Sequence, residues 1–442
     1  MATVTVPEEP ATANERRGFG AQSVGGFDRL KGEPTGPDRV SETDGTGLTR
    51  RRSWLMLAGL WLVAAGAGAY EIVPASVAPL MREAMGISPT AASGVVSVMF
   101  AVAVLGSVPI GVAVDRVDTR LVMAGATALL LGAGLWGWHA ASAGDYWTLM
   151  ASRAFGAIAF VTIWNAGAAT VGRAFESEVR ATAIAAFTAS GPAGFGLGQL
   201  TGPLVAASMG WEWVFAIYGA IALLGIAIYL PASAGGSLKA DDEPVPGLAE
   251  FGRVLTDRRI WHVSTLAFLA YALYLFVNSW MPTYLVQSVG VSLAASGALT
   301  GLFALVGVIS RVSGGAISDR LFGTRRRPVV LLSFVAATPL VVALGTVTLV
   351  PVLVVALLGA GFFIQFTLGL SLAYARELVA ENVAATAIAV ATGVSLAGAF
   401  VSPIAAAAIY ERTGSFGATF VYAVALAVVG IVLSWSAPEA DA

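Results

Sequence analysis

Three charged side chains, Glu71, Arg153 and Arg311, interrupt long apolar stretches of the sequence. A charge is expensive to place in hydrocarbon, so charges kept inside such stretches are functional candidates by default. A carboxyl can take up and release a proton, because burial favours its neutral form and a nearby arginine favours its charged form. A guanidinium can bind the carboxylate of a ligand. These residues predict proton handling and the binding of a small solute.

The chemistry of most enzyme sites is missing from the chain. It has no cysteine and two histidines, His139 and His262, both near the ends of apolar stretches. Thiolate nucleophiles and metal sites built from Cys or His are therefore excluded. Paired carboxylates inside the stretches and a G-x4-G-K-[ST] signature are also absent. We predict that the protein is not an enzyme and uses no metal, no cofactor and no direct ATP drive.

The elements that must position these charges follow from composition. Apolar residues make up 57% of the 442 residues and charged residues 12%, against about 25% charged residues in a soluble chain. Twelve apolar runs are long enough to cross ~30 Å of hydrocarbon as helices. An all-α polytopic membrane protein is therefore predicted, with spans at 54–80, 93–114, 121–140, 147–172, 183–209, 213–230, 260–286, 297–317, 328–348, 351–375, 385–409 and 417–436.

The basic residues predict the orientation of these spans. With the N-terminus inside, the cytoplasmic segments hold 21 of the 25 Lys and Arg residues and the outer loops hold two, Arg82 and Arg412. Cytoplasmic loops of membrane proteins carry this excess of positive charge. We therefore expect both termini in the cytoplasm and the protein in the plasma membrane.

The chain divides into five expected segments. Residues 1–53 form a polar, disordered cytoplasmic tail, and 437–442 form a second short tail. Residues 231–259 form a cytoplasmic loop with an amphipathic stretch at its end, and they separate a six-helix bundle at 54–230 from another at 260–436. The two bundles repeat each other: Gly111-x3-Asp115-Arg116 returns as Gly315-x3-Asp319-Arg320, and the five residues 181–185 return at 385–389, both at an offset of 204.

These motifs resemble those of the major facilitator superfamily, over residues 54–436. The family pattern G-x-x-x-D-R-x-G-R-R/K is similar to Gly111, Asp115, Arg116 and Arg120 after the second span, and to Gly315, Asp319 and Arg320 after the eighth. The resemblance implies twelve helices in two six-helix pseudo-repeats that rock around a midplane site. It also implies that these seven residues form a latch that stabilises one face of the transport cycle, whereas plain anchoring of positive loops is the simpler alternative.

Two further elements resemble parts of that family. Gly198-x3-Gly202-Pro203 in the fifth span is similar to an element associated with antiporters, and we assign it to gating, with plain helix packing as the alternative. Trp280-x-Pro282-Thr-Tyr284 in the seventh span is similar to an element of organic anion:cation symporters. Its Trp and Tyr are expected in the outer aromatic belt.

The charges in the spans take specific expected roles. Glu71 and Arg153 lie at similar depths in the outer half of the first and fourth spans, so we predict that Glu71 carries a proton and that Arg153 modulates it. A static ion pair that braces two helices is the alternative. Arg311 lies near the middle of the eighth span and is predicted to bind a substrate carboxylate. Its alternative role is a brace to the second latch.

Other polar side chains in the spans need hydrogen-bond partners away from lipid. We predict that they contact the substrate, although each could instead tie helices together: Tyr70, Asn165, Tyr271, Tyr274, Asn278 and Gln365. Trp164 is assigned to packing.

The function predicted from sequence is secondary active transport of a small organic solute by alternating access. Proton-coupled symport of an organic anion is slightly favoured, and proton-coupled efflux of amphipathic compounds is the alternative. A sensor that does not transport is a remote third reading. The expected partners are a small-molecule substrate, a coupling proton or Na⁺ and membrane lipids, with no nucleic acid and with a monomer as the default state.

Overall fold

The computed structural model describes residues 48–114, 116–236, 248–322, 325–380 and 383–439. Within these residues the secondary structure is helical throughout. The helices are α1 (Arg50–Ser76), α2 (Ala78–Met85), α3 (Pro89–Val114), α4 (Thr119–Ser142), α5 (Tyr146–Ala174), α6 (Ser177–Thr188), α7 (Ser190–Met209), α8 (Trp213–Ser233), α9 (Leu248–Thr256), α10 (Arg258–Tyr284), the π-helix η1 (Leu285–Val289), α11 (Leu293–Phe322), α12 (Arg327–Thr346), α13 (Val350–Glu377), α14 (Ala384–Thr413) and α15 (Phe416–Trp435).

Eleven of the twelve expected spans each lie mainly within one of these helices. In the described part of the chain, 11 helices are long and apolar enough to cross a membrane. The fifth expected span, 183–209, differs from the others because it is split into α6 and α7. Pro192 lacks the N–H that would bind the carbonyl of Thr188, the last residue of α6, so the helix breaks there. The prediction of an all-α polytopic membrane fold is confirmed.

Small residues allow α7 to pack closely between two other helices. A methyl group on Gly194 would lie 2.2 Å from the carbonyl oxygen of Ala65 in α1, and one on Gly198 would lie 2.9 Å from that of Ala69. On another face of α7, a methyl group on Gly196 would lie 2.4 Å from Leu305 of α11. Glycines four residues apart let helix backbones approach in this way.

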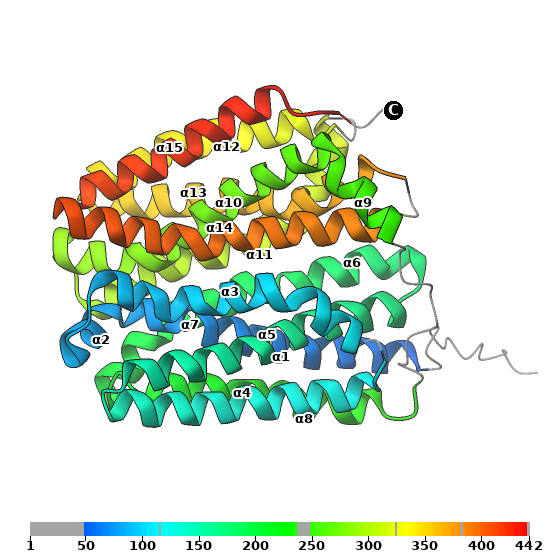
Figure 1. Cartoon of the computed structure of the whole chain (residues 1–442), viewed down its shortest axis with the longest axis horizontal. Helices are drawn as coiled ribbons and strands as arrows, with labels where there is room; N and C mark the ends of the chain where they lie inside the picture. Colours follow the sequence, from blue (N-terminus) through cyan, green and yellow to red (C-terminus); the bar gives the residue numbers. More distant parts are fainter. Residues whose placement is uncertain (1–47, 115, 237–247, 323–324, 381–382, 440–442) are drawn as a thin grey trace, which may run out of the picture. The chain divides into compact units, whose positions relative to one another are not determined.

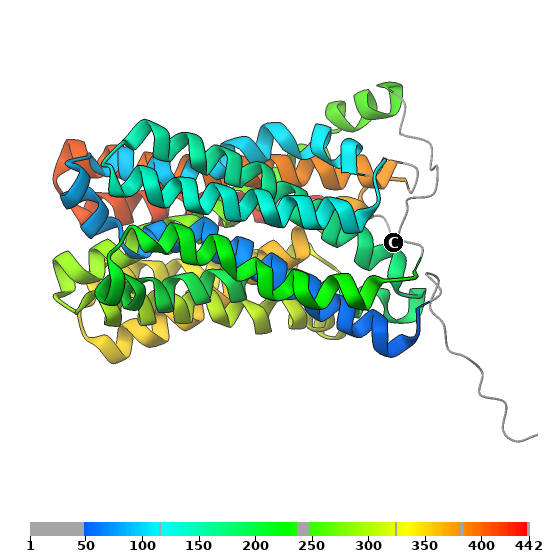
Figure 2. The same ribbon diagram turned by 90° about the horizontal axis from the view of Figure 1, so that it is seen from below.

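Two hydrophobic clusters follow the two halves of the sequence. The buried residues of one cluster all precede Ser233. The other is built from residues after Arg253, with a few members from α1, α3 and α7. Within the first half, α1 packs against α8, and the two helices lie side by side in Figure 2. Contacts between the halves join α7 to α11, α3 to α14 and α1 to α10. The proposed split into bundles at 54–230 and 260–436 remains a prediction.

The ends of the helices fall into two groups. Figure 1 places the start of α1, helix α9 and the end of α15 at one end, and α2 at the opposite end. Helix α9 is the amphipathic stretch expected at the end of the loop 231–259. The predicted tail 1–53 is mostly outside the described residues, and its last residues, from Arg50 on, already belong to α1. The start of the tail 437–442 is packed against the protein, since Ala437 is 3% exposed.

Candidate functional site

The polar centre begins at a proline in α1. Pro74 lies inside the helix and has no N–H, so the carbonyl of Tyr70, four residues earlier, loses its helical hydrogen bond. The fully buried Arg153 of α5 supplies the missing donor: its Nη1 donates to the Tyr70 carbonyl (2.8 Å). Its Nη2 and Nε donate to the backbone carbonyls of Glu71 (2.7 Å) and Val95 (3.0 Å). Arg153 therefore joins α1, α3 and α5 through their backbones.

Because the Arg153 guanidinium donates to these carbonyls, it does not form an ion pair with the Glu71 carboxylate. Glu71 is 1% exposed, and neither carboxylate oxygen has a hydrogen-bond partner in the described structure. The guanidinium lies instead over the ring of Tyr70, 4.4 Å from its centroid. The static ion pair considered from the sequence is not formed, because backbone carbonyls occupy the guanidinium.

A similar arrangement, in which a side chain from another helix binds a carbonyl freed by a proline, occurs in α10. Pro282 deprives the Asn278 carbonyl of its helical donor, and Nε2 of Gln199, on α7, donates to that carbonyl (2.6 Å). The Asn278 amide Nδ2 donates to the carbonyl of Tyr274 (2.9 Å). The bond from Gln199 crosses from the first half of the chain to the second. The sequence analysis did not select Gln199. Its polar side chain in a mainly apolar span, four residues before Pro203, was the feature that could have indicated it.

Aromatic residues and Arg311 lie next to this crossing. The ring of Tyr274 stacks between Phe195 and Phe303, with centroid distances of 5.4 and 5.6 Å. The Arg311 guanidinium lies 6.0 Å from the Tyr274 ring centroid. The ring centroid of Tyr271 lies 6.0 Å from that of Tyr274. The structure thus brings together three residues that the sequence analysis selected: Tyr271, Tyr274 and Arg311.

Glu71 belongs to the same neighbourhood. Its carboxylate and the Arg311 guanidinium both act electrostatically on the hydroxyls of Tyr271 and Tyr274. A carboxylate from the first half and a guanidinium from the second half therefore lie near the same pair of tyrosines.

Two of the predicted substrate contacts have their amide groups engaged elsewhere. Asn165 Nδ2 donates to the carbonyl of Ser107 on α3 (3.1 Å). Gln365 Nε2 donates to the carbonyls of Phe303 and Ala304 (3.1 and 3.2 Å). Both bonds tie neighbouring helices, and the Oε1 atom of Gln365 is buried without a hydrogen-bond partner in the described structure. Their substrate contacts remain predictions.

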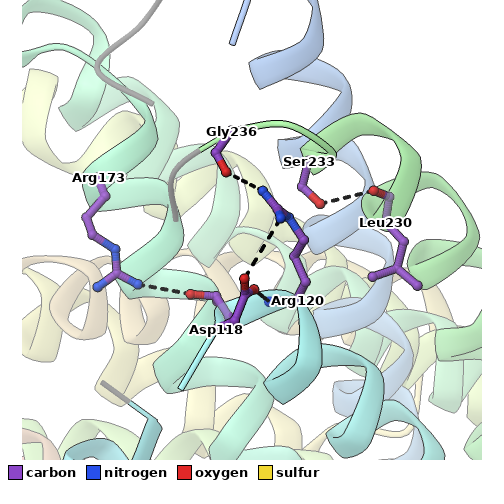
Figure 3. A network of polar contacts seen from close by, with 7 residues as sticks. Asp118, Arg120, Arg173, Leu230, Ser233 and Gly236 are labelled. Carbon is purple, nitrogen blue, oxygen red and sulfur yellow. Dashed lines mark hydrogen bonds and ion pairs between the residues drawn. The ribbon is translucent and has the colours of Figure 1, made fainter. Parts of the chain in front are cut away.

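The loop of the first predicted latch is tied to α8 (Figure 3). Arg120 donates to the carbonyl of Gly236, just beyond α8, and lies 3.8 Å from the Asp118 carboxylate. Arg173 of α5 donates to the hydroxyl of Thr119 (3.3 Å). Among the predicted latch residues, Arg116 is exposed, Gly111 faces Asn165, and Asp115 is outside the described residues. These contacts hold the loop within the first half.

The second latch region is described only in part. Gly315, Asp319 and Arg320 belong to α11, but their side chains are outside the described structure. Beyond them, Arg326 forms a bidentate pair with Glu377 at the end of α13, at 2.8–3.2 Å, and also donates to Ser318 (2.7 Å). The latch role of both loops remains a prediction.

The aromatic element of α10 does not lie in a lipid-facing belt as expected. Trp280 and Tyr284 are each 5% exposed. Trp280 Nε1 donates to the carbonyl of Pro403 on α14 (3.1 Å), and Tyr284 packs against Phe416 and Phe420 of α15. The belt prediction is wrong because this face of α10 points toward neighbouring helices. In α7, Gly198 and Gly202 pack on α1, the role that was the alternative to gating.

These features define a class of protein: a multi-pass helical membrane protein with polar and charged residues buried where its two halves meet. Within that class, the sequence profile of the Major Facilitator Superfamily matches residues 56–403. The match covers most of the chain, which belongs to this superfamily.

Individual relatives are more distant. The chain is 28% identical over 262 residues to the "Probable sulfoacetate transporter SauU" of Cupriavidus necator, covering 54% of this chain and 60% of that protein. It is 28% identical over 163 residues to the "Probable nitrate/nitrite antiporter NarK1" of Thermus thermophilus, covering 36% of this chain and 33% of that protein. The matched regions thus span less than two thirds of either relative.

Solved structures share the fold. A bacterial homologue of the human lysosomal transporter Spinster, inward-facing and unoccupied, superposes with a TM-score of 0.73 at 17% identity, covering 88% of this chain and 97% of that one. Its occupied inward-facing form gives 0.71 at 18% identity, covering 87% and 96%. At these identities the similarity establishes the fold.

Proposed function

We propose that this protein is a secondary active transporter that moves a small organic anion across the plasma membrane by alternating access, coupled to protons. Arg311 is the proposed anion site and Glu71 the proposed proton carrier. Arg153 positions the part of α1 that carries Glu71. The proposed substrate environment is completed by Tyr70, Tyr271, Tyr274, Asn165, Asn278 and Gln365.

The observation that carries the proposal is the state of Arg311. Its Nε atom is buried without a hydrogen-bond partner in the described structure, and its guanidinium lies beside Tyr274 on a helix that packs against the other half. Burying an arginine in a membrane span without a counter-charge is costly. An anionic substrate that supplies the counter-charge repays that cost.

Glu71 supports the coupling part of the proposal. An ionised carboxylate is costly to bury without a partner, so a buried, unpaired Glu71 is suited to binding a proton and releasing it when water reaches it. Na⁺ in place of the proton is the other coupling ion that a carboxylate can serve.

The names of the relatives agree with an anionic cargo, since sulfoacetate, nitrate and nitrite are all anions. The prediction of efflux of amphipathic compounds was based on the element at Gly198 and Gly202. The glycines of that element pack against α1, which is the alternative role. We therefore favour anion transport. The proposal includes cytoplasmic termini, two rocking six-helix bundles and a monomer.

Proteoliposomes that contain a pH dye test this function. Adding sulfoacetate, acetate or nitrate outside should acidify the lumen if protons enter with the anion, and the Arg311→Gln variant should lose the signal. Alkalinisation of acid-loaded vesicles by amphipathic cations, with no response to anions, would replace the proposal with efflux antiport. A response that needs Na⁺ and not a proton gradient would replace the coupling ion.

A further inference from the structure

A tryptophan of the first half and Arg311 of the second half both lie close to one glycine, Gly191. A methyl group on Gly191 of α7 would lie 3.3 Å from Cη2 and 3.4 Å from Cζ2 of Trp164, and 3.4 Å from Nη1 of Arg311. Both side chains therefore border the same point, although Trp164 is on α5 and Arg311 is on α11. Cη2 and Cζ2 belong to the six-membered ring of the indole, so this part of the ring is turned toward Gly191.

Both side chains have a buried donor without an acceptor. The Nε1 atom of Trp164 and the Nε atom of Arg311 are inaccessible to water and have no hydrogen-bond partner in the described structure. Indole and guanidinium groups only donate hydrogen bonds. A buried donor left unpaired loses the hydrogen bonds it had with water. Only a group that accepts hydrogen bonds can satisfy these two donors together.

The surroundings favour a negative charge on that group. Trp164 packs against Phe187 and Phe160, with centroid distances of 5.3 and 6.1 Å, so the indole has apolar neighbours on these sides. Arg311 brings one positive charge. Because Gly191 has no side chain, Trp164 and Arg311 can both approach α7 at this point.

Building on the proposed anion transport, we infer that Trp164 and Arg311 hold one oxyanion head group between the two halves of the protein. The head group is a carboxylate or sulfonate with a single negative charge. Arg311 supplies charge and hydrogen bonds from the second half, and the Trp164 indole N–H supplies a neutral hydrogen bond from the first. Because the donors come from different halves, the bound anion stabilises the arrangement in which the halves are close at this level.

Purified full-length protein tests this site by calorimetry with sulfoacetate, acetate and nitrate as probes. Trp164→Phe keeps an aromatic ring and removes the N–H donor. We expect it to weaken the binding of each probe that the wild type binds by about tenfold, the effect of one hydrogen bond to a charged group. The matched control is Trp136→Phe, since Trp136 is partly exposed and packs on Phe155 away from these residues. The control should bind as the wild type does.

A second measurement avoids dependence on the stability of the variant. In protein labelled with ¹⁵N at the indole nitrogens, sulfoacetate should shift the Trp164 resonance, which Trp164→Phe identifies by its disappearance. An unshifted Trp164 resonance, or wild-type affinity in Trp164→Phe while Arg311→Gln loses binding, overturns the inference and leaves the proposed function standing. A wild type that binds none of the three anions overturns the proposed function and this site with it.

Discussion

At the residue scale, the main result is the separation of Glu71 from Arg153. Similar depth in neighbouring spans made a direct interaction plausible from the sequence. In the structure Arg153 is committed to three backbone carbonyls, and the Glu71 carboxylate is left without a partner. The two residues are coupled through the backbone of α1 and not through an ion pair.

The first prediction concerns Glu71 itself. Glu71→Gln removes the group proposed to bind the coupling proton and keeps the size of the side chain. We expect uptake against a gradient to be abolished, while exchange of labelled for unlabelled substrate continues. Proteoliposome uptake with and without an imposed pH gradient measures both. Normal accumulation by the variant would eliminate Glu71 as the proton carrier.

The second prediction separates the charge of Arg153 from its hydrogen bonds. Lysine keeps the positive charge but is a compact donor that cannot reproduce the planar fork of arginine. Because Arg153 donates to carbonyls on α1 and α3, we expect Arg153→Lys to lower thermal stability nearly as much as Arg153→Met does. Thermal unfolding in detergent measures this. Wild-type stability in Arg153→Lys would mean that charge alone is required.

At the element scale, prolines determine which backbone carbonyls of α1 and α10 need a hydrogen-bond donor from another helix. Pro74 and Pro282 each free one carbonyl, and a side chain from another helix takes it: Arg153 for α1 and Gln199 for α10. Breaks in transmembrane helices are tolerated where neighbouring groups satisfy the freed backbone. These two helices open the two halves of the chain, and both contain a proline near the polar centre.

The third prediction tests this account by restoring the backbone donor. Pro74→Ala returns an N–H to position 74, so the Tyr70 carbonyl can regain its helical bond. Arg153→Met should then cost about 1 kcal/mol less than it does beside Pro74, the net value of one hydrogen bond. Unfolding of the wild type, both single variants and the double variant gives the coupling energy. Additive effects would contradict the proposed link between the two residues.

The fourth prediction concerns the packing of α7 on α1. Gly194→Ala would place a methyl group 2.2 Å from the Ala65 carbonyl oxygen, so the helices must separate. We expect a loss of about 1–3 kcal/mol in stability, as for other overpacked cores. Gly125→Ala in α4 is the matched control, because nothing lies within 4 Å of the added methyl group. Equal stability of the two variants would contradict the close contact.

At the scale of the whole molecule, the sequence predicted the spans well because each is a continuous apolar run. The split of the fifth span could be recognised only afterwards from Pro192, since residues 183–209 include no charged residue that would mark an interruption. The polar centre was predicted by residue type. Its partners were not, because the contacts of Arg153 with α1 and of Gln199 with α10 join helices that are far apart in sequence. The same holds for Trp164 and Arg311, which both approach Gly191.

Contacts between the halves also occur at the end of the molecule where α2 lies. The carboxylate of Glu411, near the end of α14, accepts a hydrogen bond from the backbone N–H of Thr90 at the start of α3 (2.7 Å). A carboxylate is stabilised at a helix N-terminus by the free N–H groups and the helix dipole. This bond therefore favours the state in which the two halves are in contact at this end.

The last prediction follows from that contact and from a chain without cysteines. The pair Thr90→Cys and Glu411→Cys places a single thiol on each half, and a short thiol-specific cross-linker should join them. If transport requires the halves to separate here, cross-linking should abolish uptake in proteoliposomes. The pair Ala91→Cys and Tyr146→Cys is the control, because the Tyr146 hydroxyl bonds to the Ala91 carbonyl (3.1 Å) within the first half. Cross-linking of that pair should leave uptake intact, since a half that moves as one body does not open between α3 and α5. Full uptake with the first pair locked would exclude separation of α3 from α14 as a step in transport.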